Sequence, residues 1–118
     1  MSLQSTDAEA AAVAKAPRVS LKDIEDKIAA QYTFTGTQAL GDGMPAHPAL
    51  DVLSICILVM RNGFTIIGKS APASAANFNA DLGRKLAYED AIRQAWPLEG
   101  YALRDRLMAA GANTKTSP

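Results

Sequence analysis

The segment Leu53–Lys69, LSICILVMRNGFTIIGK, carries the strongest structural signal in the sequence. Two runs of apolar and β-branched residues, 53–60 and 64–69, flank the pair Asn62-Gly63. Asn-Gly between such runs is typical of a two-residue type I′ hairpin turn, because both central residues must adopt positive φ. The segment therefore predicts an antiparallel β-hairpin.

A two-residue turn also sets the register of this hairpin. Counting outward from the turn places Val59 opposite Ile66 and Leu58 opposite Ile67. Both faces of the paired strands then carry apolar side chains. We expect each face to pack against another part of the protein or a partner.

After the hairpin, the spacing of apolar residues changes to that of a helix. Ser74 is a candidate N-cap for a helix over 75–96, and Pro97 is expected to end it. Pro97 also suits the first turn of a second helix over 98–110, which Gly111 would end. The sequence thus predicts a C-terminal helical hairpin.

The 75–96 helix has one bulky side and one small side when it is placed on a helical wheel. The bulky residues are expected to form the core stripe: Phe78, Leu82, Leu86, Ile92 and Trp96. The small residues lie opposite: Ala80, Gly83, Ala87, Ala91 and Ala95. Gly83 costs about 1 kcal/mol in a helix interior, so the small side should pack closely against something. Either the second helix folds back over it, or another protomer packs there.

The N-terminal region contains one clear helix signal. Residues 1–18 are rich in Ala and lack large apolar residues at helical spacing, so we expect a flexible arm. Ser20 followed by Asp23 resembles a capping box. It predicts a short helix over 21–30.

Between this helix and the hairpin, the sequence indicates a strand and a loop. Residues 31–37 alternate aromatic and Thr side chains, as a strand does, whereas 36–48 is rich in Gly and Pro. The predicted fold class is therefore α+β, with a short N-terminal helix, a small antiparallel sheet and the helical hairpin. We expect a single domain over 19–111, followed by a polar tail at 112–118.

Composition excludes several classes of function. Twelve Lys and Arg balance twelve Asp and Glu among 118 residues, whereas proteins that bind duplex DNA usually carry a basic excess. The run Leu53–Met60 is too short to span a membrane, and no secretory signal is visible, so a cytoplasmic location is expected.

Residues that could perform catalysis or bind a metal are scarce. Cys56 and His47 are the only residues of their types, which excludes an internal disulfide and argues against a protein-only zinc site. No catalytic set or Gly-rich phosphate loop is recognisable. We therefore predict a binding protein without a cofactor, rather than an enzyme.

The start of the long helix offers groups that could bind a phosphorylated nucleotide. Asn77 provides an amide, Arg84 and Lys85 provide cations, and Tyr88 provides an aromatic ring. Arg pairs with phosphate oxygens, and a helix N-terminus favours an anion. The alternative is that these are ordinary surface residues, with Lys85 forming an i,i+4 ion pair with Glu89.

Three motifs in the C-terminal half resemble those of a family of small proteins of tailed phages. They are NGFTIIGKSA at 62–71, ANFNADLGRKLAYEDA at 76–91 and WPLEGYALRDRL at 96–107. Together they resemble the Thoeris anti-defence family of nucleotide-signal sponges, which is related to anti-CBASS sponges. The resemblance covers roughly Leu53 to Leu107.

This resemblance implies a fold and an activity. Such proteins form dimers or larger oligomers such as hexamers, and they sequester cyclic ADP-ribose isomers made by immune TIR enzymes. Some also bind cyclic di- or trinucleotides. Binding lowers the free signal without breaking a bond, which requires affinity and stoichiometry rather than catalysis. The expected location is then the host cytoplasm.

The resemblance also suggests which residues contact the ligand. Asn77-Phe78 and Gly83-Arg84-Lys85 match family motifs, so these positions are expected to contact ligand or to pack between protomers. The predicted ligand-binding residues are Asn77, Phe78, Arg84, Lys85, Tyr88 and Arg104. An alternative function is a phage protein that docks on a host protein without a small ligand. A DNA-binding regulator is the weakest alternative, because net charge is zero and no helix-turn-helix signature occurs.

Overall fold

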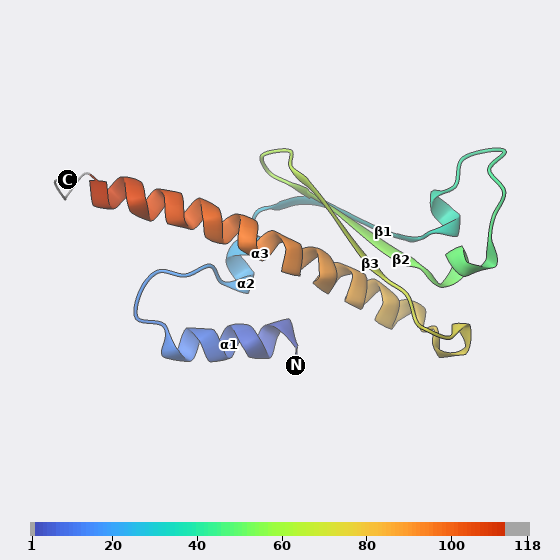
Figure 1. The fold of residues 1–118 in the computed structure, drawn as a ribbon, viewed down its shortest axis with the longest axis horizontal. Coiled ribbons are helices and arrows are strands. Elements are labelled where there is room, and N and C mark those ends of the chain that lie inside the picture. The colour runs from blue at the N-terminus through green and yellow to red at the C-terminus, as the bar shows by residue number, and fades with distance from the viewer. Residues whose placement is uncertain (1, 113–118) are drawn as a thin grey trace. The chain divides into compact units, whose positions relative to one another are not determined.

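The structure, a computed structural model, describes residues 2–112 of the chain. The described residues form two compact units, 2–26 with 95–112, and 27–94. Figure 1 shows the order of the elements along the chain. The predicted tail at 112–118 lies outside the described residues except for Ala112.

The first unit begins with a helix inside the segment that was expected to be a flexible arm. Helix α1 spans Leu3–Val13, and the side chain of Ser2 caps it by accepting a hydrogen bond from the Ser5 N–H. Asp7 ties this helix to the following segment: its carboxylate lies 2.9 Å from the Arg18 guanidinium and accepts from the Leu21 N–H. The flexibility of this segment stays a prediction.

The predicted capping box is confirmed, but the helix that it starts is short. Helix α2 spans Leu21–Glu25; the Ser20 side chain accepts from the Asp23 N–H, and the Asp23 carboxylate accepts from the Ser20 N–H. The helix was expected to continue to residue 30. Instead the chain extends from Ile28, because its β-branched side chain opens a strand rather than a third helical turn.

The second unit contains a three-stranded antiparallel sheet in the order β1-β2-β3. Strand β1 spans Ile28–Thr35, β2 spans Ser54–Met60 and β3 spans Thr65–Ser70. The loop between β1 and β2 contains short 3-10 turns at Thr37–Ala39 and Pro48–Val52. The hairpin of β2 and β3 is therefore confirmed.

The turn of this hairpin has one residue more than predicted. The Met60 N–H donates to the Phe64 carbonyl at 2.8 Å, and the Gly63 N–H donates to the Met60 carbonyl at 2.8 Å. Only Gly63 has positive φ here, at 89°, so the loop is a type I turn with a Gly bulge instead of a type I′ turn.

The longer loop shifts the register by one residue. Leu58 lies opposite Ile66, and Val59 lies opposite Thr65, so the predicted pairs were wrong. Because side chains alternate between faces, this shift decides which face each residue occupies. Ser54, Cys56, Leu58 and Met60 are buried, whereas the residues between them are only half-buried.

One continuous helix replaces the expected helical hairpin. Helix α3 spans Ala80–Ala112 with Pro97 inside it, so part of it belongs to each unit. Pro97 removes one backbone N–H and crowds the preceding turn, but the adjacent residues are held in place. Ala95 is 1% exposed, and the Trp96 indole N–H donates to the Val19 carbonyl at 3.3 Å within the first unit. These contacts offset the tendency of Pro97 to end the helix.

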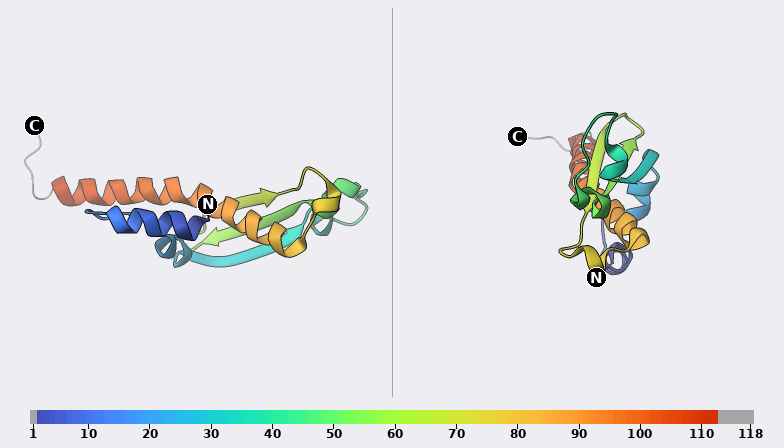
Figure 2. Two further views of the ribbon diagram at one scale, coloured as in Figure 1. Left: turned by 90° about the horizontal axis from the view of Figure 1, so that it is seen from below. Right: turned by 90° about the vertical axis from the view of Figure 1, so that its right-hand side faces the viewer.

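In the second unit, the small side of α3 packs on the sheet, which Figure 2 shows alongside the helix. A Cβ on Gly68 of β3 would lie 2.1 Å from the Ala87 carbonyl oxygen and 2.9 Å from the Ala91 Cβ. The sheet, rather than the second helix or other protomer that was expected, therefore covers Ala87 and Ala91. The expected core stripe is partly exposed instead, with Leu82 at 50% and Leu86 at 38%. Backbone-to-backbone approach at Gly68 favours the small residues as the buried face.

Candidate functional site

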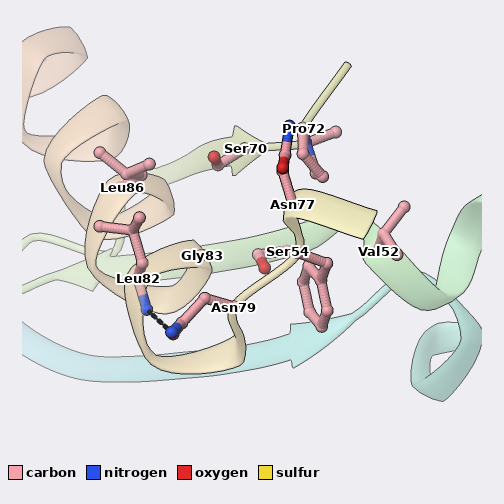
Figure 3. A pocket seen from close by; sticks show the side chains of 11 residues that line it. Val52, Ser54, Ser70, Pro72, Asn77, Asn79, Leu82, Gly83 and Leu86 are labelled. Carbon is pink, nitrogen blue, oxygen red and sulfur yellow. Dashed lines mark hydrogen bonds between the residues drawn. The ribbon is translucent and has the colours of Figure 1, made fainter. Parts of the chain in front are cut away.

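A small pocket lies in the second unit, where the end of the sheet meets the start of α3 (Figure 3). Its volume is about 100 Å³. The lining comes from the strand ends, from the segment after β3 and from the first turns of α3. These residues are Val52, Ser54, Ser70, Ala71, Pro72, Asn77, Phe78, Asn79, Leu82, Gly83 and Leu86.

Paired serines form the sheet side of this pocket. Ser54 and Ser70 lie opposite each other at the ends of β2 and β3. Ser54 is only 2% exposed, and it lines the pocket together with Ser70. Serine hydroxyls can donate a hydrogen bond to, and accept one from, a polar group that enters the pocket.

Gly83 makes room for the Ser54 hydroxyl. A Cβ on Gly83 would lie 2.4 Å from the Ser54 Oγ, so any larger residue would collide with it. This contact explains a glycine in the interior of α3, which otherwise destabilises the helix. Gly83 and Ser54 therefore pack directly against each other.

The helix side of the pocket is the N-terminus of α3. The Asn79 Oδ1 accepts a hydrogen bond from the Leu82 N–H at 3.0 Å, which caps the helix at Asn79. Residues 75–77, predicted to be the start of this helix, form a separate 3-10 turn. This turn places Asn77, with an exposed side chain, and the half-buried Phe78 on the wall of the pocket.

The chemistry of the lining suits a neutral polar group. Hydroxyls and side-chain amides can donate and accept hydrogen bonds, and Phe78 offers an aromatic face. None of the lining residues is charged. A sugar hydroxyl or the edge of a base fits this inventory better than an isolated phosphate does.

The predicted cations are not part of the pocket. Arg84 is exposed and pairs with Asp81 one turn earlier on α3, and Lys85 is exposed. At 3.6 residues per turn, Arg84 is rotated by about 160° from Leu82, which lines the pocket. The structure thus separates Arg84 from the pocket within one protomer. No Lys85–Glu89 ion pair is recorded within residues 2–112 either, although Glu89 is 7% exposed.

The other predicted site residues lie at different places. Asn77 and Phe78 line the pocket, whereas Tyr88 is half-buried further along α3. Arg104 is exposed in the part of α3 that belongs to the first unit. The structure therefore brings together Asn77 and Phe78 alone from the predicted set.

Sequence reasoning missed the serines and the capping Asn79. Ser54 and Ser70 come together only through the β2–β3 register, which was predicted one residue out. Gly83 was the one available signal, since an unexplained glycine in a helix indicates close approach of another group. The group that approaches it is the Ser54 side chain.

Elsewhere the described residues provide no cluster suited to a metal ion. No group of three His, Cys, Asp or Glu side chains suited to a metal is found within residues 2–112. His47 accepts a hydrogen bond from the Ala49 N–H at 3.0 Å through its Nδ1. Burial raises the pKa of the Cys56 thiol, although a hydrogen bond with Thr33 acts in the opposite direction. Across the same residues, no helix is long and apolar enough to cross a membrane.

Comparison with protein families gives one match. Residues 19–107 match the model of the Phage protein (N4 Gp49/phage Sf6 gene 66) family, which is more than half of the chain. The chain belongs to this family. The matched range contains the sheet, most of α3 and every residue that lines the pocket. No curated protein and no solved structure gives a significant match.

Proposed function

We propose that this phage-family protein sequesters a cyclic nucleotide immune signal without cleaving it. The ligand would be a cyclic ADP-ribose isomer or a related cyclic oligonucleotide, acting in Thoeris or CBASS-like immunity in the host cytoplasm. The observation that carries the proposal is the pocket in which the Ser54 hydroxyl, Asn77 and the Phe78 ring meet. The motif resemblance described above supplies the identity of the ligand.

The pocket would hold one part of such a ligand. Pockets that enclose drug-sized molecules usually measure about 300–1,000 Å³, whereas this pocket measures about 100 Å³. A ribose ring could donate to and accept from Ser54 and Asn77 while the base stacks on Phe78. The phosphates would then lie outside the uncharged lining, and the cations of an oligomer partner could reach them there.

Sequestration also agrees with the composition of the pocket. No charged residue lines the pocket. The lining therefore offers no carboxylate, imidazole or thiol that could transfer a proton or attack a bond. Hydrogen-bond donors and acceptors without such groups are suited to reversible binding. We accordingly propose a non-catalytic role.

The proposal is tested by thermal unfolding with defined ligands. A TIR-generated cyclic ADP-ribose isomer and cyclic di- and trinucleotides are each added to the purified protein. At a hundredfold excess over Kd, binding adds about 2.7 kcal/mol to the free energy of unfolding and raises Tm. Asn77→Ala should lower the apparent affinity for the ligand at least tenfold and so reduce the Tm shift. Thr65→Ala, at an exposed position of β3, should leave the Tm shift unchanged.

Two outcomes would contradict this function. If saturating concentrations of every nucleotide leave Tm unchanged, the protein is not a sponge for these signals. If the nucleotide is bound but recovered as a cleaved product, the protein is an enzyme. Thermal unfolding measures the first outcome, and mass spectrometry of the ligand after heating measures the second on the same samples.

A second candidate function is docking on a host protein. The sheet face opposite α3 carries half-buried Ile55, Ile57 and Phe34 together with Ile67, 59% exposed, and Tyr32, 56% exposed. Large exposed apolar patches commonly mark interaction surfaces. Retention of one stoichiometric host protein by the wild-type chain, lost in Ile67→Lys and accompanied by no nucleotide, would favour this alternative.

A further inference from the structure

Helix α1 has little stability of its own. It spans Leu3–Val13, and none of its residues is buried. Isolated helices shorter than about 12–15 residues are marginally stable in water, and α1 has 11 residues. Its first turn has no acidic residue and its last turn has no basic residue, so neither end gains from the helix dipole. The helical state of α1 therefore depends on its contacts with the rest of the first unit.

Asp7 bonds α1 to the segment that follows it. The Asp7 Oδ1 accepts from the Arg18 Nη1 at 2.9 Å and from the Leu21 N–H at 3.2 Å. The Asp7 carbonyl also accepts from the Arg18 Nη2, at 3.0 Å. The side chains of Arg18 and Asp7 are only 25% and 21% exposed, so water weakens their attraction less than that of a fully exposed pair. We refer to these three bonds as the Asp7 latch.

The chain beyond the latch is fixed separately, around Val19. The Val19 carbonyl accepts from the Trp96 indole N–H at 3.3 Å and from the Arg18 Nη1 at 3.2 Å. Helix α2 follows directly, and its residues Leu21 and Ile24 are buried. These contacts do not involve α1. They should therefore persist when α1 is released.

Residues 14–17 join α1 to this fixed segment. All four are exposed and lie outside any helix or strand, and Figure 1 shows them in the loop between α1 and α2. A change of backbone angles in this loop would move α1 without disturbing α2. Residues 14–17 are thus placed to act as a hinge.

We propose that α1 is a strap that the Asp7 latch holds closed and that opens and unfolds when this charge pair is screened. Charge-assisted hydrogen bonds are about twice as strong as neutral ones, and added salt weakens the attraction between the two charges. Once released, an 11-residue helix does not persist in water. The flexible arm that the sequence predicts is then the open state, and helix α1 is the closed state.

This device is independent of the proposed function. Residues 3–13 lie outside the range 19–107 that matches the family, and none of them lines the pocket. Opening exposes the Arg18 guanidinium and the Leu21 N–H to solvent, both within the first unit. Nucleotide binding in the second unit should therefore neither require nor prevent it.

The helical population of residues 3–13 in the full chain, measured by NMR from carbon chemical shifts, tests the strap. At low ionic strength the wild-type chain should be helical there. Asp7→Asn should lower the ratio of closed to open α1 about tenfold or more, because the side chain loses the charge that strengthens its bonds. Raising salt from about 0.02 M to about 1 M should lower this ratio several-fold in the wild-type chain and little in the variant.

Glu9→Gln is the matched control. It removes the same charge from α1 at an exposed position two residues from Asp7, so it should leave the ratio unchanged. Trp96 is the only tryptophan of the chain, and its emission reports on the fixed segment around Val19. This emission should stay constant while α1 opens.

Four results would overturn the proposal. The latch is wrong if α1 stays helical in Asp7→Asn or if Glu9→Gln opens it equally. The hinge is wrong if Trp96 emission changes in parallel with the loss of α1, because the whole first unit would then unfold. A helical population of wild-type α1 that does not respond to salt would exclude an electrostatic strap, and this titration requires no variant.

Discussion

Gly68 has the least room for a side chain of the glycines in the second unit. It lies beneath α3, where a Cβ would come within 2.1 Å of the Ala87 carbonyl oxygen and 2.5 Å of the Ala91 nitrogen. Backbone atoms cannot move aside as the end of a flexible side chain can. The position of the helix over the sheet therefore depends on this single residue.

Gly68→Ala is expected to lower the free energy of unfolding by about 3 kcal/mol, because α3 must shift away from β3. Gly100→Ala is the matched control: nothing lies within 4 Å of its Cβ, and it occupies the interior of α3. The control should raise stability by up to about 1 kcal/mol. Urea unfolding measures both, and equal effects of the two variants would contradict this packing.

Cys56 is fully buried, and burial raises the pKa of its thiol above its ordinary value of 9.0. The folded protein thus binds this proton more tightly than the unfolded chain does. The resulting contribution to stability is complete below pH 9 and is lost as pH rises through the folded pKa.

We therefore expect the stability of the wild-type chain to fall more steeply above pH 9 than that of Cys56→Ala. Chemical unfolding at several pH values gives the difference between the two chains, in which the contributions of Tyr and Lys cancel. Parallel curves would show that the thiol does not titrate differently in the folded state. The folded thiol should also react slowly with a thiol reagent until denaturant is added.

At the scale of elements, turns and caps were well predicted where local chemistry decides them. The Ser20–Asp23 capping box formed as expected, because its bonds involve neighbouring residues alone. The hairpin at Asn62-Gly63 also formed, but its loop has three residues. The pattern Asn-Gly is compatible with both loops, and one extra residue moved every pair of the β2–β3 ladder.

The turn requires a positive φ at Gly63, whose φ is 89°. Gly63→Asn should cost little, since Asn tolerates positive φ, whereas Gly63→Val should cost at least about 1 kcal/mol. Thermal unfolding of the two variants ranks them. Equal Tm values would contradict a left-handed residue at this position.

Pro97 shows where local rules failed. A proline usually ends or bends a helix, yet α3 continues to Ala112, and contacts of Ala95 and Trp96 just before Pro97 hold the chain. Such tertiary contacts are not visible in a single sequence. The helix still loses the backbone bond that the Pro97 nitrogen cannot donate.

Pro97→Ala should accordingly raise the free energy of unfolding by about 1–3 kcal/mol, because the side chain is exposed and the missing bond is restored. Circular dichroism with urea unfolding measures the gain. A loss of stability would show that α3 requires the bend at Pro97.

At the scale of the whole molecule, the sequence predicted the α+β class and the small antiparallel sheet, but not helix α1, the continuity of α3 or how α3 packs on the sheet. The bulky stripe of Leu82 and Leu86 was the natural choice for the core, and the small column was left for a partner. The small column packs on the sheet instead, because Gly68 has no side chain and lets Ala87 and Ala91 come close to β3. That pairing joins residues far apart in the chain, so no local pattern contains it.

The same limit applies to the candidate site. Asn77 and Phe78 follow from the sequence motifs, whereas Ser54 joins them only after the strands pair and α3 packs. Arg84 and Lys85 were predicted with them because they are close in sequence. Neither of them lines the pocket, and Arg84 lies on a different side of α3 from Leu82, which does.

The most direct test of the proposed sponge is recovery of an intact signal. The purified protein is mixed with limiting TIR-generated cyclic ADP-ribose isomer, and free nucleotide is measured by mass spectrometry in an ultrafiltrate before and after heating. The account predicts depletion of the free signal at stoichiometric protein and full recovery of the unchanged nucleotide on denaturation. An undiminished free signal, or recovery of a cleaved product, would contradict it.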